Sequence, residues 1–104
     1  MAALTKIEND ALLEKVKGFL GVTGTFNDGN LSMLIADVKY YLMDAGVHEV
    51  AVNSEAAIGV IARGVDDMWS LGSGTVNLSQ YFKERAIQLA ISYPSNREIK
   101  HKEA

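Results

Sequence analysis

The chain has 104 residues, of which 48% are hydrophobic and 22% are charged, and it carries a formal net charge of −3 and no cysteine. This length and composition predict a single globular domain and exclude a low-complexity chain. The lack of cysteine excludes disulfides, zinc–thiolate sites and cysteine nucleophiles, while the acidic balance argues against a protein that wraps the DNA backbone.

The first predicted helix begins near residue 10, with Asn9 or Asp10 as its N-cap. Gly21 follows the last apolar residue and suits a C-terminal cap. Lys17 falls outside the apolar stripe, so we expect its side chain in solvent. The stripe predicted to face the core consists of Leu12, Leu13, Val16, Phe19 and Leu20.

A loop rich in Gly, Asn, Asp and Thr at residues 23–30 precedes the second predicted helix. Asp28 or Asn30 is the expected N-cap, and Gly46 ends the helix. Its inner positions are Leu31, Leu34, Ile35, Val38, Tyr41, Leu42 and Ala45. The following stretch, VHEVAVN, alternates like a short strand, but one isolated strand has no evident partner, so we predict an irregular connection.

Asn53 or Ser54 is the expected cap of a third helix, which Gly72 ends. Its apolar positions are Ile58, Ile61, Ala62, Val65, Met68 and Trp69. A second loop, GSGTVNLS, leads to a fourth helix, in which Asn77 and Gln80 resemble a capping box. The inner stripe of the fourth helix is Phe82, Ala86, Leu89, Ala90 and Tyr93, and Pro94 stops it.

The predicted fold class is therefore all-α: a small bundle of about four helices with a polar C-terminal tail. We expect one helical domain over residues 1–93. Residues 94–104 form a tail that we expect to be flexible until it docks on a partner. No apolar run reaches the roughly 18–20 residues of a membrane span, and we expect no signal peptide.

The stretch IARGVDDMWSLGSG at residues 61–74 concentrates the unusual residues of the chain. Asp66 and Asp67 point about 100° apart on a helix, so we expect a solvated face paired with Arg63 rather than a metal site. Gly64 costs about 0.8–1.0 kcal/mol inside a helix relative to alanine. Either another helix approaches closely there, or the glycine is simply tolerated. Trp69 continues the apolar stripe and can also anchor an interface.

Other candidate sites lack the spacing that their chemistry needs. The GSGTVNLS loop has neither the lysine nor the preceding strand of a phosphate loop. His48 and His101 show no metal-ligand pairing, and we expect both in solvent. A DNA-binding helix-turn-helix needs a turn of about 3–4 residues, and every predicted connection here is longer.

Three stretches carry a family resemblance: ALLEKVKGFLGVTG at 11–24, LSMLIADVKYYLMDAGV at 31–47, and the long stretch at 56–92. Together they resemble the head–tail connector family of tailed phages, small helical adaptors also labelled DNA-packaging proteins. The stretch at 56–92 is similar to the version found in phages and prophages of Gram-positive bacteria. The resemblance covers most of residues 10–93, whereas the tail after Pro94 matches no pattern that we can name.

The resemblance implies a ring, usually of twelve subunits, that sits below the portal protein in the virion and extends the DNA channel. Such a ring receives a stopper or tail-completion protein, and its C-terminal segment docks on the portal. We therefore expect a structural adaptor without catalytic activity, cofactor or metal, assembled in the host cytoplasm and located at the head–tail interface. Genomic DNA would pass through the channel without specific binding, and no membrane is involved.

Two sets of contact residues follow as hypotheses. Charge pairing and aromatic anchoring favour Arg63, Asp66, Asp67 and Trp69 for contact between subunits. The basic residues of the tail, Arg97, Lys100 and Lys102, are the candidates for portal docking. The alternative is a small helical nucleic-acid-binding module of a terminase-like or regulatory kind, and a third class, an enzyme, is disfavoured because no polar residues converge by spacing.

Overall fold

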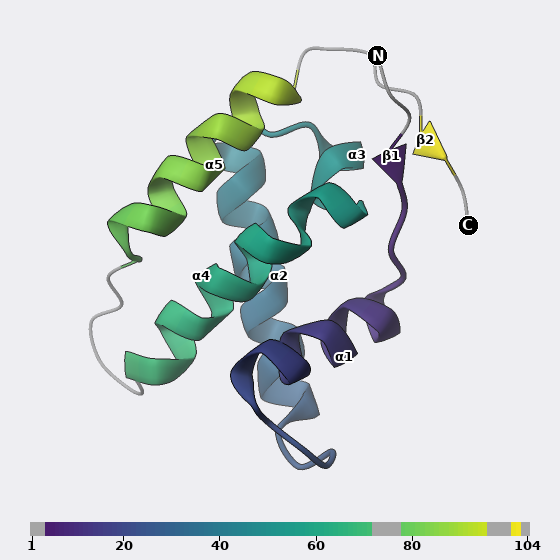
Figure 1. Cartoon of the computed structure of the whole chain (residues 1–104), viewed down its shortest axis with the longest axis vertical. Helices are drawn as coiled ribbons and strands as arrows, with labels where there is room; N and C mark the ends of the chain where they lie inside the picture. The colour runs from purple at the N-terminus through teal and green to yellow at the C-terminus, as the bar shows by residue number, and fades with distance from the viewer. Residues whose placement is uncertain (1–3, 72–77, 96–100, 103–104) are drawn as a thin grey trace.

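Five α-helices make up most of the described chain, which covers residues 4–71, 78–95 and 101–102 of a computed structural model (Figure 1). The predicted all-α fold class is confirmed. The elements in chain order are β1 (Leu4–Thr5), α1 (Asn9–Leu20), α2 (Asp28–Asp44), α3 (Glu49–Val52), the 3-10 helix η1 (Glu55–Ala57), α4 (Ile58–Leu71), α5 (Gln80–Ser92) and β2 (His101–Lys102). No helix of the described ranges is long and apolar enough to cross a membrane.

Helix α4 lies at the centre of the bundle and contacts α1, α2 and α5. In Figure 1, α2 runs behind α4, while α1 and α5 lie on either side of it. The inner stripes of all four long helices meet in one hydrophobic core. Its largest fully buried side chains include Phe82, Leu12, Leu31, Leu42, Ile61, Val16, Val38 and Val65. The apolar spacing of the sequence therefore identified the buried faces correctly at these positions.

Gly64 lies where α4 packs against Val38 of α2 and Phe82 of α5. A Cβ atom at this position would lie 2.7 Å from Phe82 Cε1 and 3.0 Å from Val38 Cγ1. Both neighbours are fully buried, and the Phe82 ring also packs against Tyr41 at a centroid distance of 5.3 Å. The glycine is thus required by close helix approach, which decides between the two interpretations left open by the sequence.

The predicted helix starts are wrong by one to three residues. The N-cap positions are Glu8 for α1 and Asn27 for α2, and neither side chain makes a capping hydrogen bond. Ser79, rather than Asn77, is the N-cap of α5, and its hydroxyl accepts a hydrogen bond from the Phe82 amide at 3.1 Å. Asn77 itself, like Gly72, lies outside the described residues. Of the predicted N-caps only Ser54 is confirmed, although it starts η1, which leads directly into α4. The predicted C-cap at Gly21 is confirmed, with a φ of +74°.

The VHEVAVN stretch is not irregular, because it contains the short helix α3. His48 caps this helix by accepting a hydrogen bond from the Val50 amide through Nδ1 at 3.0 Å. The His48 amide in turn donates to the Tyr93 carbonyl at 2.7 Å, which ties the end of α5 to this turn. The histidine has a local structural role that the prediction of a solvated side chain did not include.

Lys17 is buried rather than solvated, with a side chain only 7% exposed. Its Nζ atom lies 2.8 Å from Asp28 Oδ1 and 3.6 Å from Glu14 Oε2, and it donates a hydrogen bond to the Gly24 carbonyl. The hydrogen bond with Asp28 raises the pKa of Lys17 above its usual value. The loop between α1 and α2 is therefore held by one cation, a contact that helix periodicity cannot reveal.

The two ends of the described chain lie side by side. β1 pairs with β2 in parallel, with Leu4 opposite His101 and Thr5 opposite Lys102 (Figure 1). Part of the tail is thus paired with the N-terminal segment, a strand that was not predicted. Residues 96–100 and 103–104 lie outside the described residues, so the expected tail flexibility stays a prediction there.

Candidate functional site

Arg63 is the centre of the most distinctive polar site in the described structure. Its guanidinium carbon lies 5.5 Å from the centroid of the Phe19 ring and 5.3 Å from that of Tyr81. Phe19 comes from the last turn of α1 and Tyr81 from the first turn of α5. Because the ring faces carry partial negative charge, both rings attract the cation and hold it across the outer side of α4.

The acid that pairs with Arg63 is Asp66, one helical turn further along α4. Its Oδ2 atom lies 3.7 Å from Arg63 Nη1, and the two side chains are 40% and 33% exposed. A pair so accessible to water contributes at most about 1 kcal/mol to stability. The Arg63 Nε atom is buried and has no hydrogen-bond partner among the described residues, so any outside group must reach the guanidinium through its exposed part.

Asp67 has a different function from Asp66, as their separate helix faces predict. Its Oδ2 atom accepts a hydrogen bond from the backbone amide of Ser79 at 3.0 Å. Ser79 is the N-cap of α5, so this carboxylate fixes the start of α5 against the end of α4. Within the parts of the chain that are described, no cluster of three or more His, Asp or Glu side chains could hold a metal ion.

A cavity of about 250 Å³ opens beside Arg63. Arg85 from α5 joins the lining, so that two guanidinium groups and two aromatic rings face the same space. The lining residues are Phe19, Ala56, Gly59, Val60, Arg63, Tyr81 and Arg85, which we call the arginine pocket. Guanidinium groups bind carboxylate and phosphate oxygens, and they also stack on planar groups. The pocket is therefore suited to a negatively charged or aromatic group of a partner.

The other predicted contact residues are not gathered in this pocket. Trp69 is partly buried and packs against the hydrophobic core. Lys102 lies in β2, which pairs with β1 and does not line the pocket. Arg97 and Lys100 lie outside the described residues. Of the four residues assigned to subunit contact, Arg63 and Asp66 thus line or border one exposed surface, while Asp67 acts within its own chain.

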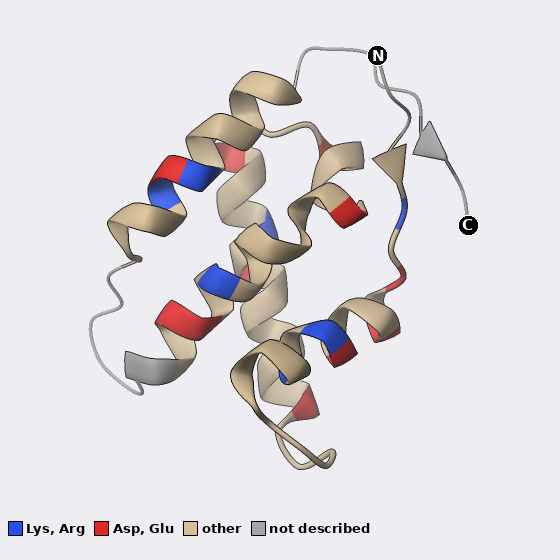
Figure 2. Cartoon of the chain, viewed as in Figure 1, with Lys and Arg blue, Asp and Glu red and all other residues tan. Residues whose placement is uncertain are grey.

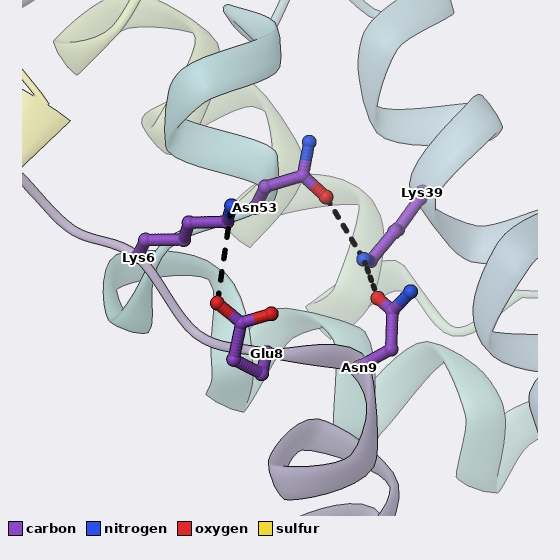
Figure 3. A network of polar contacts seen from close by, with 5 residues as sticks. All are labelled: Lys6, Glu8, Asn9, Lys39 and Asn53. Atoms are coloured by element: carbon purple, nitrogen blue, oxygen red, sulfur yellow. Dashed lines mark hydrogen bonds and ion pairs between the residues drawn. The ribbon is translucent and has the colours of Figure 1, made fainter. Parts of the chain in front are cut away.

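A second hollow lies between α1 and α2, with a volume of about 410 Å³. At its edge, Lys39 Nζ donates hydrogen bonds to Asn53 Oδ1 at 2.9 Å and to Asn9 Oδ1 at 3.4 Å (Figure 3). Figure 3 also shows the ion pair between Lys6 and Glu8, in which Lys6 Nζ lies 3.8 Å from Glu8 Oε1. Partial burial lowers the pKa of Lys39. These contacts join α1, α2 and the end of α3, and we interpret them as structural.

The sequence identified Arg63 but missed the residues that complete its pocket. Phe19 was assigned to the core, yet half of it is exposed. Tyr81 and Arg85 lie four residues apart on α5, a spacing that places them on one helix face. This spacing could have indicated that the two side chains line the same surface. The local sequence, however, does not indicate that residues of α1 and α5 both contact Arg63 of α4.

The chain matches no protein-family model, no curated protein and no solved structure at a significant level.

Proposed function

We propose that the chain is a structural head–tail connector, or adaptor, of a tailed phage or prophage. In this role it forms a ring below the portal protein, with the twelve subunits that the resemblance implies. The ring extends the DNA channel and receives the stopper or tail-completion protein. The observation that carries the proposal is the arginine pocket: a preformed, charged and aromatic surface on a small helical domain. Such a surface serves binding, because arginine and aromatic residues are enriched at protein interfaces.

Exposed apolar side chains elsewhere support an assembly function. Met33, Tyr40, Ile87 and Ile91 are all more than half exposed on the outer faces of α2 and α5. Single exposed apolar residues are ordinary on a protein surface. In this chain the four exposed apolar residues recur at helical spacing on two separate helices. Two such surfaces suit a subunit that contacts neighbours on more than one side.

The two ends of the molecule differ in a way that suits an adaptor between two partners. The β1–β2 pair lies toward the upper end of Figure 1, and the loop that joins α1 and α2 lies at the lower end. That loop carries Phe26, whose side chain is 95% exposed. We assign portal docking to the end with the β1–β2 pair, to which Lys102 belongs, and stopper docking to the end with Phe26.

The charge distribution agrees with a conduit that does not hold DNA tightly. Lysine and arginine alternate with acids over the long helices, and no continuous basic stripe is visible on the described chain in this view (Figure 2). Strong phosphate binding requires several cations along one path. A net charge of −3 therefore favours passage of DNA over binding.

One observation favours the alternative, a nucleic-acid-binding module. Arginines beside exposed aromatic rings also form the stacking platforms of single-strand-binding proteins. Such a module would bind DNA or RNA through Arg63, Arg85 and Tyr81, with an affinity that falls steeply as salt rises.

The test combines gene context with binding. A connector gene should lie downstream of portal and major capsid genes and upstream of tail-completion genes. The chain is then mixed with the portal protein encoded beside it, and the complex is weighed by native mass spectrometry. A portal carrying a ring of copies supports the proposal. No binding to the portal, together with salt-sensitive binding of a DNA oligonucleotide at micromolar concentration, would replace it with the alternative.

A further inference from the structure

We propose that the chain associates head-to-tail with a second copy of itself, and that the arginine pocket of one copy receives an acidic ridge on α2 of the next. The ridge consists of Met33, Asp37, Tyr40 and Asp44. This inference rests on the proposed function and extends it, because it identifies the two surfaces that meet at each seam of the ring.

The ridge follows from the helical positions of α2. The buried residues of this helix are Leu31, Ile35, Val38 and Leu42. Residues 33, 37, 40 and 44 recur at intervals of four and three, so they form a second stripe on the opposite side of the same helix. All four are exposed, with Met33 at 68% and Tyr40 at 65%. The ridge thus presents two large side chains and two carboxylates to the outside.

The acids of the ridge have no cation partner among the described residues of their own copy. No described residue makes an ion pair or hydrogen bond with Asp37 or Asp44. Asp44 is also the last residue of α2, a helix whose last turn carries no basic residue. A carboxylate at that end opposes the helix dipole, so a cation supplied by another molecule would stabilise it.

The arginine pocket has the complementary character. Arg85 hydrogen-bonds to Gln88 and makes no ion pair with a described acid. Among the described acids, only Asp66 pairs with Arg63, through Nη1 at 3.7 Å, and the Arg63 side chain stays 40% exposed. Tyr40, the largest side chain of the ridge, lies between Asp37 and Asp44 along α2. Insertion of its ring into the pocket would therefore bring a carboxylate toward each side of the pocket, where guanidinium groups can bind it.

The pocket and the ridge lie on opposite faces of the molecule. The pocket is built on α4, α1 and α5, whereas α2 packs behind α4 and turns the ridge away from it (Figure 1). A surface that meets a different surface on an identical neighbour makes a heterologous contact, which generates a closed ring when the rotation between copies closes. This is the geometry that a connector ring needs, whereas a two-fold dimer would pair one face with itself.

Charge exchange between the two surfaces provides the test. Arg85→Glu and Asp37→Lys change exposed side chains, so both variants should fold like the wild type, as circular dichroism will check. Each variant alone places like charges at the seam and should weaken self-association about tenfold or more, measured by native mass spectrometry with and without the portal. An equimolar mixture of the two variants restores opposite charges at every seam and should recover assembly. Lys83→Glu, on α5 but outside the pocket, is the matched control.

Engineered cysteines test the direction of the contact, because the chain has no cysteine of its own. Ala56→Cys places a thiol at the pocket and Ala36→Cys places one beside the ridge; both positions are exposed. Under oxidation, a mixture of the two variants should form mixed disulfide dimers, while each variant alone should not cross-link. Cross-linking of either variant with itself, or none in the mixture, would overturn the head-to-tail seam.

The outcomes separate this inference from the proposed function. A portal-bound ring whose mass is unchanged in Arg85→Glu and Asp37→Lys alone would leave the connector function standing and refute this seam. Failure of the wild-type chain to bind the portal protein would refute the proposed connector function itself. DNA binding that Arg85→Glu abolishes, without mixed cross-links, would assign the pocket to nucleic acid instead.

Discussion

Arg63 and Gly64 are neighbours in sequence but face opposite environments across α4. On the Gly64 side, Phe82 and Val38 approach so closely that there is no room for a methyl group. On the Arg63 side, a cavity of about 250 Å³ opens between two aromatic rings and a second arginine. One side of the helix is specified by packing and the other by charge and access to solvent.

This difference indicates where function can be located without cost to the fold. Closely packed interiors respond to a change of one methyl group, because displaced atoms have no free volume to enter. An exposed, stacked arginine can exchange water for a partner while the core stays unchanged. We therefore expect variants on the Gly64 side to change stability, and variants on the Arg63 side to change assembly.

The largest effect on stability is expected for Gly64→Ala. Alanine is the better helix former by up to about 1 kcal/mol, but its Cβ would clash with Phe82 and Val38. We expect a net loss of about 1–3 kcal/mol in the free energy of unfolding by urea.

Gly59→Ala is the matched control on the same helix, because a Cβ there meets no atom within 4 Å. It should be neutral or stabilising, by up to about 1 kcal/mol. If both variants lost the same stability, the effect at position 64 could not be attributed to the close approach of Phe82 and Val38.

A smaller effect is expected at the junction of α4 and α5. Ser79→Ala removes the hydroxyl that caps α5 and should cost about 0.5–2 kcal/mol in thermal or urea unfolding. Ser32→Ala, an exposed serine inside α2, should change stability by less than about 0.5 kcal/mol. If both variants behaved alike, the cap would contribute nothing to holding α5.

Arg63→Ala should affect stability still less. Its ion pair with Asp66 is exposed to water and its two ring contacts lie at the surface, so we expect a loss of no more than about 1 kcal/mol. Assembly on the portal, followed by native mass spectrometry, should nevertheless be strongly impaired. A variant that assembles normally would remove Arg63 from the interface.

The smallest effect is a pH dependence at Lys17, whose pKa is raised above the usual 10.5, first by the Asp28 hydrogen bond. A base with a raised pKa in the folded state contributes stability below its unfolded pKa and loses it as pH rises through the folded value. The difference in unfolding free energy between wild type and Lys17→Met should therefore stay constant from pH 7 to about 9.5 and shrink above about 10.5. Lys15→Met, an exposed neighbour, should show no such trend.

The sequence allowed the helices and most of their buried faces to be predicted, because apolar spacing depends only on local geometry. Helix caps were predicted poorly at Asn9 and Asn77, since capping depends on how the chain enters the helix. Lys17 was misplaced because its partners lie in a loop that folds back on α1. The arginine pocket could be predicted only in part, because Phe19 and Tyr81 reach Arg63 from helices distant in sequence. Contact between subunits stays a prediction for all four residues assigned to it.

The most direct test of the connector account is a cryo-electron microscopy reconstruction of the chain bound to the portal protein encoded beside its gene. We predict a closed ring on the portal, with Arg63 or Arg85 of each subunit at salt-bridge distance from Asp37 or Asp44 of its neighbour. A ring that leaves the arginine pocket in solvent would contradict the seam. A portal without any ring of this chain would contradict the proposed function.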